Sequence, residues 1–136
     1  MIRSLFVNLP VADLARTQAF FSALGFGFNA RFTNEQAACL VVNEHISCML
    51  LQRSFFQGFT KLPLADARAA TEVLLALQRD SREEVHAMVA KAVAAGATTP
   101  NEVQDMGFMV QHGFADLDGH QWEVFFMDES AAPPQP

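Results

Sequence analysis

The sequence predicts an α+β fold made of two βαβββ modules in tandem. A strand-like run followed by a capped amphipathic helix occurs twice, and three further short strand-like runs follow each helix. The start and stop signals of the first helix, Asp13 and Gly25, recur at a similar offset as Asp80 and Gly96. With 136 residues, 51% of them hydrophobic and 18% charged, the chain is long and apolar enough for one packed domain.

The first module is predicted within residues 4–52. Residues 4–11 alternate as a strand in which Val7 and Leu9 share the face expected to pack against a helix. Asp13 is the predicted N-cap of that helix. Turn-prone residues separate the next three runs, which therefore predict an antiparallel meander. These runs are residues 27–33, 36–42 and 45–52.

The second module is predicted within residues 71–128 and repeats this order. Residues 71–78 form the opening strand. Asp80 and Ser81 are alternative N-caps of the following helix, each with a glutamate three residues further on. Three short strands complete the module, at residues 97–103, 108–114 and 121–127.

The remaining segments are a connection at residues 53–70 and a Pro-rich tail at residues 131–136, so that residues 1–130 form a single domain. The connection carries Phe55, Phe56 and Phe59, too many aromatic rings for an ordinary solvated loop. The rings are consistent with a lid over an apolar pocket, with a dimer contact, or with a small satellite core.

Composition excludes several classes of protein. The formal net charge is −6, and no basic run is present that could neutralise a row of phosphates, so nucleic acid is not an expected partner. No apolar run is long enough for a membrane span or a signal core, and a cytoplasmic location is expected. A two-residue turn at Asn43 and Glu44 would place Cys39 opposite Cys48, but free thiols are expected in a reducing compartment.

Three motifs occur in order along the chain and resemble a known superfamily. They are LPVADL at residues 9–14 with FF at 20–21 and LGF at 24–26, SREEV at 81–85 with AAG at 94–96, and FADLDGHQWE at 114–123. Together they resemble the vicinal oxygen chelate superfamily, which includes glyoxalase I, extradiol dioxygenases and bleomycin-resistance proteins.

The resemblance implies two sheets that curl around a cavity, with the helices on the outer face. In active members, it further implies a divalent metal held by His, Gln or Glu on the first and last strands of each module. At those positions this sequence has Phe6 and Met49 in the first module and Glu72 and Glu123 in the second. Asn8 is the nearest polar residue on the face of the first strand that is expected to line the cavity. It is expected to converge with the two carboxylates.

Two carboxylates hold Mg²⁺ or Mn²⁺ only weakly, whereas tight transition-metal sites need three or more protein ligands including imidazole. The expected cofactor is therefore none, or a weakly bound divalent ion at Glu72 and Glu123. Among the histidines only His112 is expected to point into the cavity. The residues expected to line the binding site for a small molecule are Phe6, Asn8, Met49, Phe55, Phe56 and His112.

Two functions remain open from the sequence. The first is a non-catalytic protein that binds a small molecule in a Phe-lined cavity with a degenerate metal site, and the chain has 13 Phe and no Tyr. The alternative is a lyase, isomerase or dioxygenase in which Glu72 and Glu123 are catalytic. Loss of metal-ligand types in the first module favours binding, and retention of two carboxylates favours catalysis. A homodimer is expected because members of the superfamily often dimerise.

Overall fold

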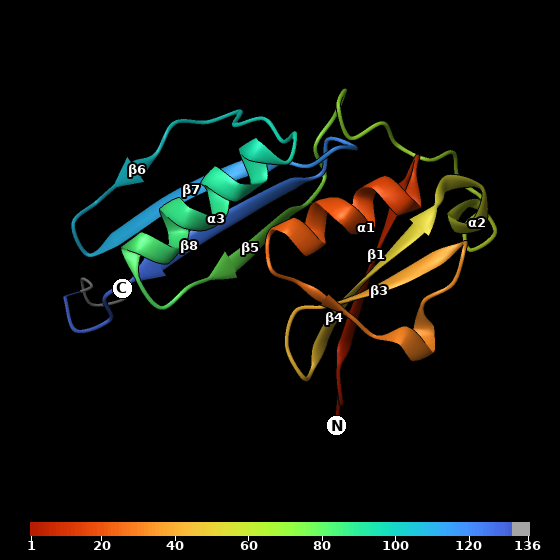
Figure 1. Ribbon diagram of the computed structural model, residues 1–136, viewed down its shortest axis with the longest axis horizontal. Coiled ribbons are helices and arrows are strands. Elements are labelled where there is room, and N and C mark those ends of the chain that lie inside the picture. The colour runs from red at the N-terminus through yellow and green to blue at the C-terminus, as the bar shows by residue number, and fades with distance from the viewer. Residues whose placement is uncertain (132–136) are drawn as a thin grey trace. The chain divides into compact units, whose positions relative to one another are not determined.

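The computed structural model describes residues 1–131 and consists of two compact units (Figure 1). The N-terminal unit is Met1–Asp66 and the C-terminal unit begins at Ala67. The boundary lies inside the predicted connection at residues 53–70, so each unit contains one predicted module. Residues 132–136, which make up most of the predicted Pro-rich tail, lie outside the described residues.

The N-terminal unit is a four-stranded mixed sheet in the order β1-β4-β3-β2. β1 is parallel to β4, and the other neighbouring strands are antiparallel. Its elements are β1 (Leu5–Val11), α1 (Leu14–Ala23), β2 (Gly27–Phe28), a short 3-10 helix (Ala30–Phe32), β3 (Ala37–Val41), β4 (Ile46–Gln52) and α2 (Arg53–Gln57).

The C-terminal unit repeats this topology in the order β5-β8-β7-β6, again with one parallel pair, β5 and β8. Its elements are β5 (Leu74–Gln78), α3 (Arg82–Ala94), β6 (Gln104–Asp105), β7 (Met109–Ala115) and β8 (Gln121–Met127). The predicted α+β fold of two βαβββ modules is therefore confirmed. No helix within residues 1–131 is long and apolar enough to cross a membrane.

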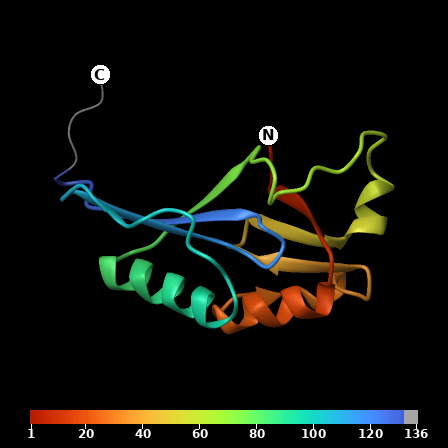
Figure 2. The same cartoon turned by 90° about the horizontal axis from the view of Figure 1, so that it is seen from above.

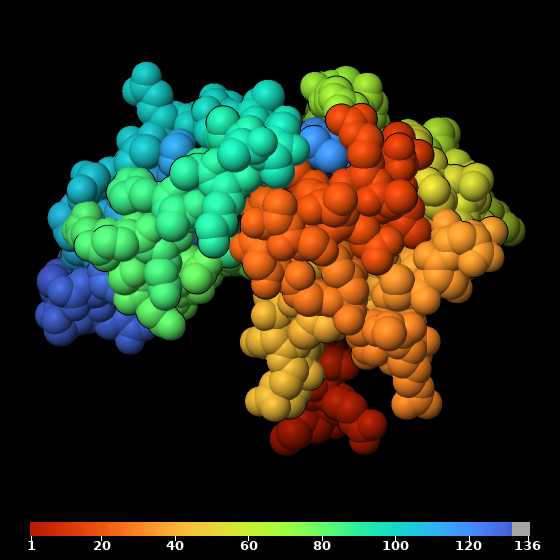
Figure 3. Space-filling model, viewed as in Figure 1, coloured from red at the N-terminus to blue at the C-terminus, as the bar shows by residue number. Residues whose placement is uncertain are grey.

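α1 covers one face of the N-terminal sheet (Figure 2). The helix begins where the Asp13 carboxylate accepts a hydrogen bond from the backbone N–H of Arg16 at 3.1 Å, as predicted for an N-cap. Phe21 is fully buried at the helix–sheet contact, and Leu9 of β1 is 5% exposed. In the space-filling view of Figure 3 the atoms of α1, in orange-red, cover part of the strands behind them.

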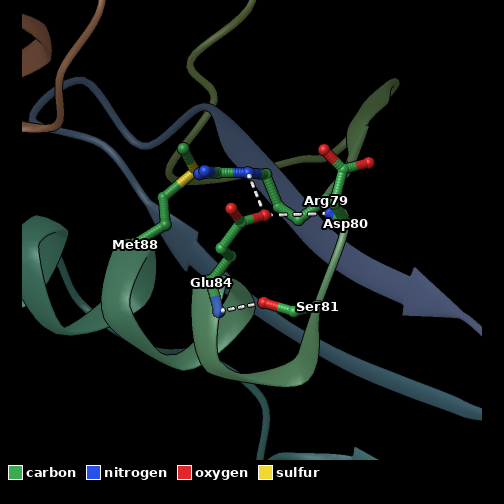
Figure 4. A network of polar contacts seen from close by, with 5 residues as sticks. All are labelled: Arg79, Asp80, Ser81, Glu84 and Met88. Atoms are coloured by element: carbon green, nitrogen blue, oxygen red, sulfur yellow. Dashed lines mark hydrogen bonds and ion pairs between the residues drawn. The ribbon is translucent and has the colours of Figure 1, made fainter.

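The N-cap of α3 is Ser81 and not Asp80 (Figure 4). The Ser81 hydroxyl accepts from the backbone N–H of Glu84 at 3.1 Å, and the Glu84 carboxylate reaches back to the backbone N–H of Asp80 at 3.0 Å. The Arg79 guanidinium lies 3.6 Å from the same carboxylate. This reciprocal arrangement satisfies two backbone donors at the helix start, as in a capping box.

Replacing Ser81 with alanine is expected to lower the free energy of unfolding by about 1 kcal/mol, because the Glu84 backbone N–H loses its acceptor. Asp80→Ala is the matched control, since its side chain does not cap the helix. That control is expected to change stability by less than about 0.5 kcal/mol. Urea unfolding followed by circular dichroism measures both variants. Equal losses for the two variants would contradict the assignment of the cap.

Two predicted strands are shorter than expected, and a third, at residues 97–103, does not form, because the short strand in this part of the chain is β6 at Gln104–Asp105. β2 has only two residues because the Asn29 side chain accepts from the backbone N–H of Arg31 at 3.1 Å and starts a 3-10 turn. Residues 97–103 pair with β7 only at Thr98, and Pro100 in the middle of this run lacks the backbone donor that a ladder needs. β5 begins at Leu74, opposite Gln121, because β8 has no residues to pair with earlier ones.

The expected pairing of Cys39 with Cys48 is wrong by one residue. Cys39 pairs with Met49 and Leu40 pairs with Cys48, so the two cysteine side chains point to opposite faces of the sheet. The connection is longer than two residues because the Asn43 side chain accepts from the backbone N–H groups of His45 and Ile46. Both thiols are free and buried, as predicted.

Candidate functional site

Glu123 lies on the open face of the C-terminal sheet, which is the face turned away from α3. Its neighbours along β8, Trp122 and Val124, are 2% and 0% exposed and face the helix. Side chains alternate along a strand, so Glu123 points to the other side. There the residue is only half-buried.

A second polar side chain, Gln111 of β7, is bonded to this carboxylate. The Gln111 amide nitrogen donates to Glu123 Oε2 at 2.6 Å. Gln111 is not opposite Glu123 in the ladder but opposite Phe125, so the contact is diagonal across the two strands. Sequence reasoning missed Gln111. It follows Val110 in a predicted strand, and because neighbouring side chains point to opposite faces, the apolar Val110 indicates that Gln111 faces the other side.

Small residues flank Glu123 in both adjoining strands. Gly113 of β7 and Ala76 of β5 are its register partners. A Cβ atom at Gly113 would lie 2.7 Å from the carbonyl oxygen of Trp122, so a side chain here would force the strands apart. The carboxylate consequently has no bulky neighbour at its own level of the sheet.

Glu72 is not on the opening strand of the second module, and this part of the prediction is wrong. β5 begins two residues later, and Glu72 is exposed. The residue level with Glu123 is Ala76, four positions further along the chain, a strand distance of roughly 13 Å. The preceding residue, Thr71, accepts a hydrogen bond from the Gln121 side chain at 2.9 Å, which holds this segment at the start of β8.

His112 faces α3 and not the open face, which corrects the expected inward orientation. It alternates with Gln111 along β7 and shares the face of Val110 and Phe114, which are 0% and 1% exposed. Burial on this side lowers the pKa of His112 below its usual 6.5, and the nearby His86 of α3 lowers it further. The structure therefore separates His112 from Glu123 by the thickness of the sheet.

The lowered pKa of His112 predicts how stability changes with pH. Near and below pH 6.5 the unfolded chain binds a proton at this residue more readily than the folded chain does, so acidification from pH 7 destabilises the fold. His112→Gln is expected to make stability less dependent on pH between about 7 and 5. Urea midpoints across this range measure the effect, with His45→Gln, a change at an exposed histidine, as control. An unchanged slope in His112→Gln would contradict the prediction.

Three predicted residues share the open face of the N-terminal sheet. Asn8 of β1 lies level with Met49 of β4, and Phe6 precedes Asn8 on the same face. Phe6 is 48% exposed. The structure therefore brings Phe6, Asn8 and Met49 together within their own unit.

Phe55 and Phe56 lie on α2, a helix that the sequence left as part of a connection. Both rings are half-buried, and Phe55 packs edge to face against Phe59 at 5.3 Å between centroids. α2 packs against β1 and β4 of its own sheet. The sequence signal for this helix is weak because it has only five residues.

The donor set of the C-terminal unit does not fit a tightly held transition metal. Nowhere in residues 1–131 do three or more His, Cys, Asp or Glu side chains gather closely enough to bind a metal ion. Around Glu123 the adjoining strands supply only the Gln111 amide, because the other neighbours are Gly113 and Ala76. Tight sites for such metals use three or four protein ligands, commonly with imidazole or thiolate.

The start of β8 is set by Asp116, a buried carboxylate in the preceding turn. Asp116 is 5% exposed and accepts hydrogen bonds from the backbone N–H groups of Asp118 and His120 and from the indole N–H of Trp122, all at 3.0 Å. Burial raises the pKa of Asp116 above its usual 3.8, although the charge of His120 and the hydrogen bonds from Trp122 and Asp118 oppose the shift. By fixing Trp122, the turn determines which face Glu123 occupies.

Comparisons with known proteins agree on the fold. Residues 3–43 match a family model described as bleomycin resistance protein-like N-terminal. A hypothetical protein from S. aureus is 28% identical, with a TM-score of 0.79 over 93% of this chain and 94% of that chain. A search of the curated proteins gives no match.

Two further solved structures resemble the chain at lower identity. A glyoxalase-related enzyme from Fulvimarina pelagi is 20% identical, with a TM-score of 0.79 over 93% of this chain and 88% of that one. The fosfomycin resistance protein FosX from Listeria monocytogenes is 19% identical, with a TM-score of 0.67 over 100% and 97% of the two chains. At these identities the likeness establishes the fold and leaves the ligand open.

Proposed function

We propose that this chain, a relative of the vicinal oxygen chelate superfamily by its fold and its N-terminal family match, binds a small organic molecule without a tightly held metal ion. The superfamily resemblance expected from the three sequence motifs is confirmed by these comparisons. Binding of a small molecule by this chain is our inference. It rests on the chemistry of the open sheet faces.

The observation that carries the proposal is the Glu123–Gln111 pair on the open face of the C-terminal sheet. Binding sites for small molecules combine apolar walls with a few polar groups held in place. Gln111 holds the carboxylate, and neither Gly113 nor Ala76 places a bulky side chain at its level of the sheet. Phe125, the register partner of Gln111, adds a half-buried ring on the same face.

The N-terminal unit contributes the other part of the proposal. Phe6 supplies an exposed ring, Met49 an adaptable apolar side chain and Asn8 a hydrogen-bonding group, all on one sheet face. We include Phe55 and Phe56 of α2 among the ligand contacts. The convergence of Asn8 with Glu123 stays a prediction, as do the homodimer and the cytoplasmic location.

A catalytic role is the second candidate, and one observation favours it. A carboxylate held by a neighbouring amide is already oriented, as a general base must be. In that case Glu123 would abstract a proton from an enolisable substrate in a lyase or isomerase reaction. The expected second carboxylate, Glu72, precedes β5 and is not level with Glu123, which weakens this candidate relative to binding.

Replacing Glu123 with glutamine is the test of the proposed site. The variant keeps the shape of the side chain and removes its charge, so we expect the affinity for bound molecules to fall about tenfold or more while the melting temperature stays nearly unchanged. Molecules that co-purify are identified by native mass spectrometry, and their affinities are measured by calorimetry. Glu102→Gln, which makes the same change at an exposed loop residue, is the control.

The two candidates give different results in this experiment. If the protein only binds its ligand, the wild type releases the co-purified molecule chemically unchanged. If it is an enzyme, the wild type converts the molecule and Glu123→Gln does not. Equal affinity of wild type and Glu123→Gln for every bound molecule would contradict both candidates at this site.

A further inference from the structure

The Glu123–Gln111 pair leaves two hydrogen-bond acceptors free on the open face. An ionised carboxylate only accepts hydrogen bonds, so the contact at 2.6 Å assigns the Gln111 amide nitrogen as the donor. The Gln111 amide oxygen and the second carboxylate oxygen of Glu123 then remain as acceptors. Within residues 1–131 neither side chain makes another hydrogen bond or ion pair.

The carboxylate also lacks a counter-ion in the part of the chain that the structure describes. No ion pair within residues 1–131 involves Glu123. Burying part of a charge without a partner costs free energy, and a bound cation would offset that cost. The formal net charge of −6 adds to the attraction for a cation.

The surroundings favour a flat group over a compact one. Gly113 and Ala76 present little more than backbone on either side of Glu123. Phe125 lies two residues further along β8 on the same face, where its ring can contact a delocalised cation. A planar group with two N–H donors engages two acceptors at once, whereas an ammonium ion acts as a point charge.

We propose that Gln111 and Glu123 together recognise a planar cation with two N–H donors, an amidinium or guanidinium group, in the small molecule that the protein binds. This inference rests on the proposed function, because it names the chemistry of a ligand at the same site. It assigns to Gln111 a role in specificity. Gln111 orients the carboxylate through its nitrogen and accepts from the ligand through its oxygen.

Four small aromatic probes test the inference with the full-length protein. Benzamidine carries the planar cation, benzylamine an ammonium ion, benzamide a neutral planar amide and benzoate an anion. Each is titrated into ¹⁵N-labelled protein, and the backbone amide shifts of residues 109–115 and 121–127 are followed. We expect benzamidine to shift these amides at a concentration about tenfold lower than the other three probes require.

Two variants separate the contributions of the pair. Glu123→Gln is expected to remove the preference for benzamidine over benzamide, because the charge is lost. Gln111→Leu is expected to remove the preference for benzamidine over benzylamine, because only one acceptor remains. Glu102→Gln is expected to behave as wild type, and unchanged backbone amide shifts along α3 in the probe-free variants show that the C-terminal unit is folded.

The outcomes that overturn the inference are distinguishable from failure of the proposed function. If benzoate, benzamide or benzylamine shifts the same amides at least as strongly as benzamidine, the ligand class is wrong while the binding face stands. If no probe shifts these amides and no co-purified molecule depends on Glu123, the proposed function and the inference fail together. Unchanged probe preference in both variants would also overturn the role of the pair.

Discussion

Replacing Asp116 with alanine is expected to lower the free energy of unfolding by about 3 kcal/mol. The Asp116 carboxylate is 5% exposed and accepts three hydrogen bonds, from the backbone of Asp118 and His120 and from the Trp122 indole. Alanine leaves these donors without their acceptor in a buried turn. Each such loss costs about 1–3 kcal/mol when water cannot replace the acceptor. The backbone N–H groups of Asp118 and His120 are only part-buried, so hydrogen bonds to water offset part of their loss.

Urea unfolding followed by the fluorescence of Trp122, the one tryptophan of the chain, measures the effect directly. A double-mutant cycle with Trp122→Phe, followed by circular dichroism, isolates the indole hydrogen bond. In the Trp122→Phe background the cost of Asp116→Ala is expected to fall by about 1 kcal/mol, because one donor is already absent. A loss below about 1 kcal/mol in the single variant would contradict the role assigned to Asp116.

Replacing Phe21 with alanine is expected to cost about 4 kcal/mol of stability. Phe21 is 0% exposed, and its ring makes edge-to-face contacts with Phe20 at 4.9 Å and Phe26 at 5.7 Å between centroids. Alanine would leave a cavity between α1 and the sheet, because the surrounding side chains relax only partly around the missing ring. Aromatic contacts add to the cost beyond the area that is buried.

A loss of this size approaches the total stability of many domains, so Phe21→Leu is the second variant and is expected to cost about 1.5 kcal/mol. Phe32→Ala is the matched control, because Phe32 is 51% exposed and its ring lies under the Arg31 guanidinium. That control is expected to cost less than about 1 kcal/mol. Urea unfolding by circular dichroism ranks the variants, and equal costs for Phe21→Ala and Phe32→Ala would refute the assignment of Phe21 to the core.

The local patterns of the sequence determined the order and type of the main elements. Asp13 begins the first helix because a side-chain acceptor is needed at its N-terminus, and Gly25 follows its end with φ of +101°. Gly96 follows the second helix with φ of +113°. These signals act over a few residues, so they can be read without knowledge of the partner strands. The alternation along β1 and β8 likewise placed Asn8 and Glu123 on the faces away from the helices.

Only the tertiary structure decided the pairing between strands and with it the composition of the site. A shift of one residue in register moves a side chain to the other face, which is why the expected Cys39–Cys48 pair failed. His112 faces α3 because it alternates with Gln111 and shares the side of the buried Val110 and Phe114. The partner of Glu123 is not Glu72, because β5 starts only where β8 can pair with it. Its partner is Gln111, which meets Glu123 diagonally across two strands, a contact that depends on register and not on sequence spacing.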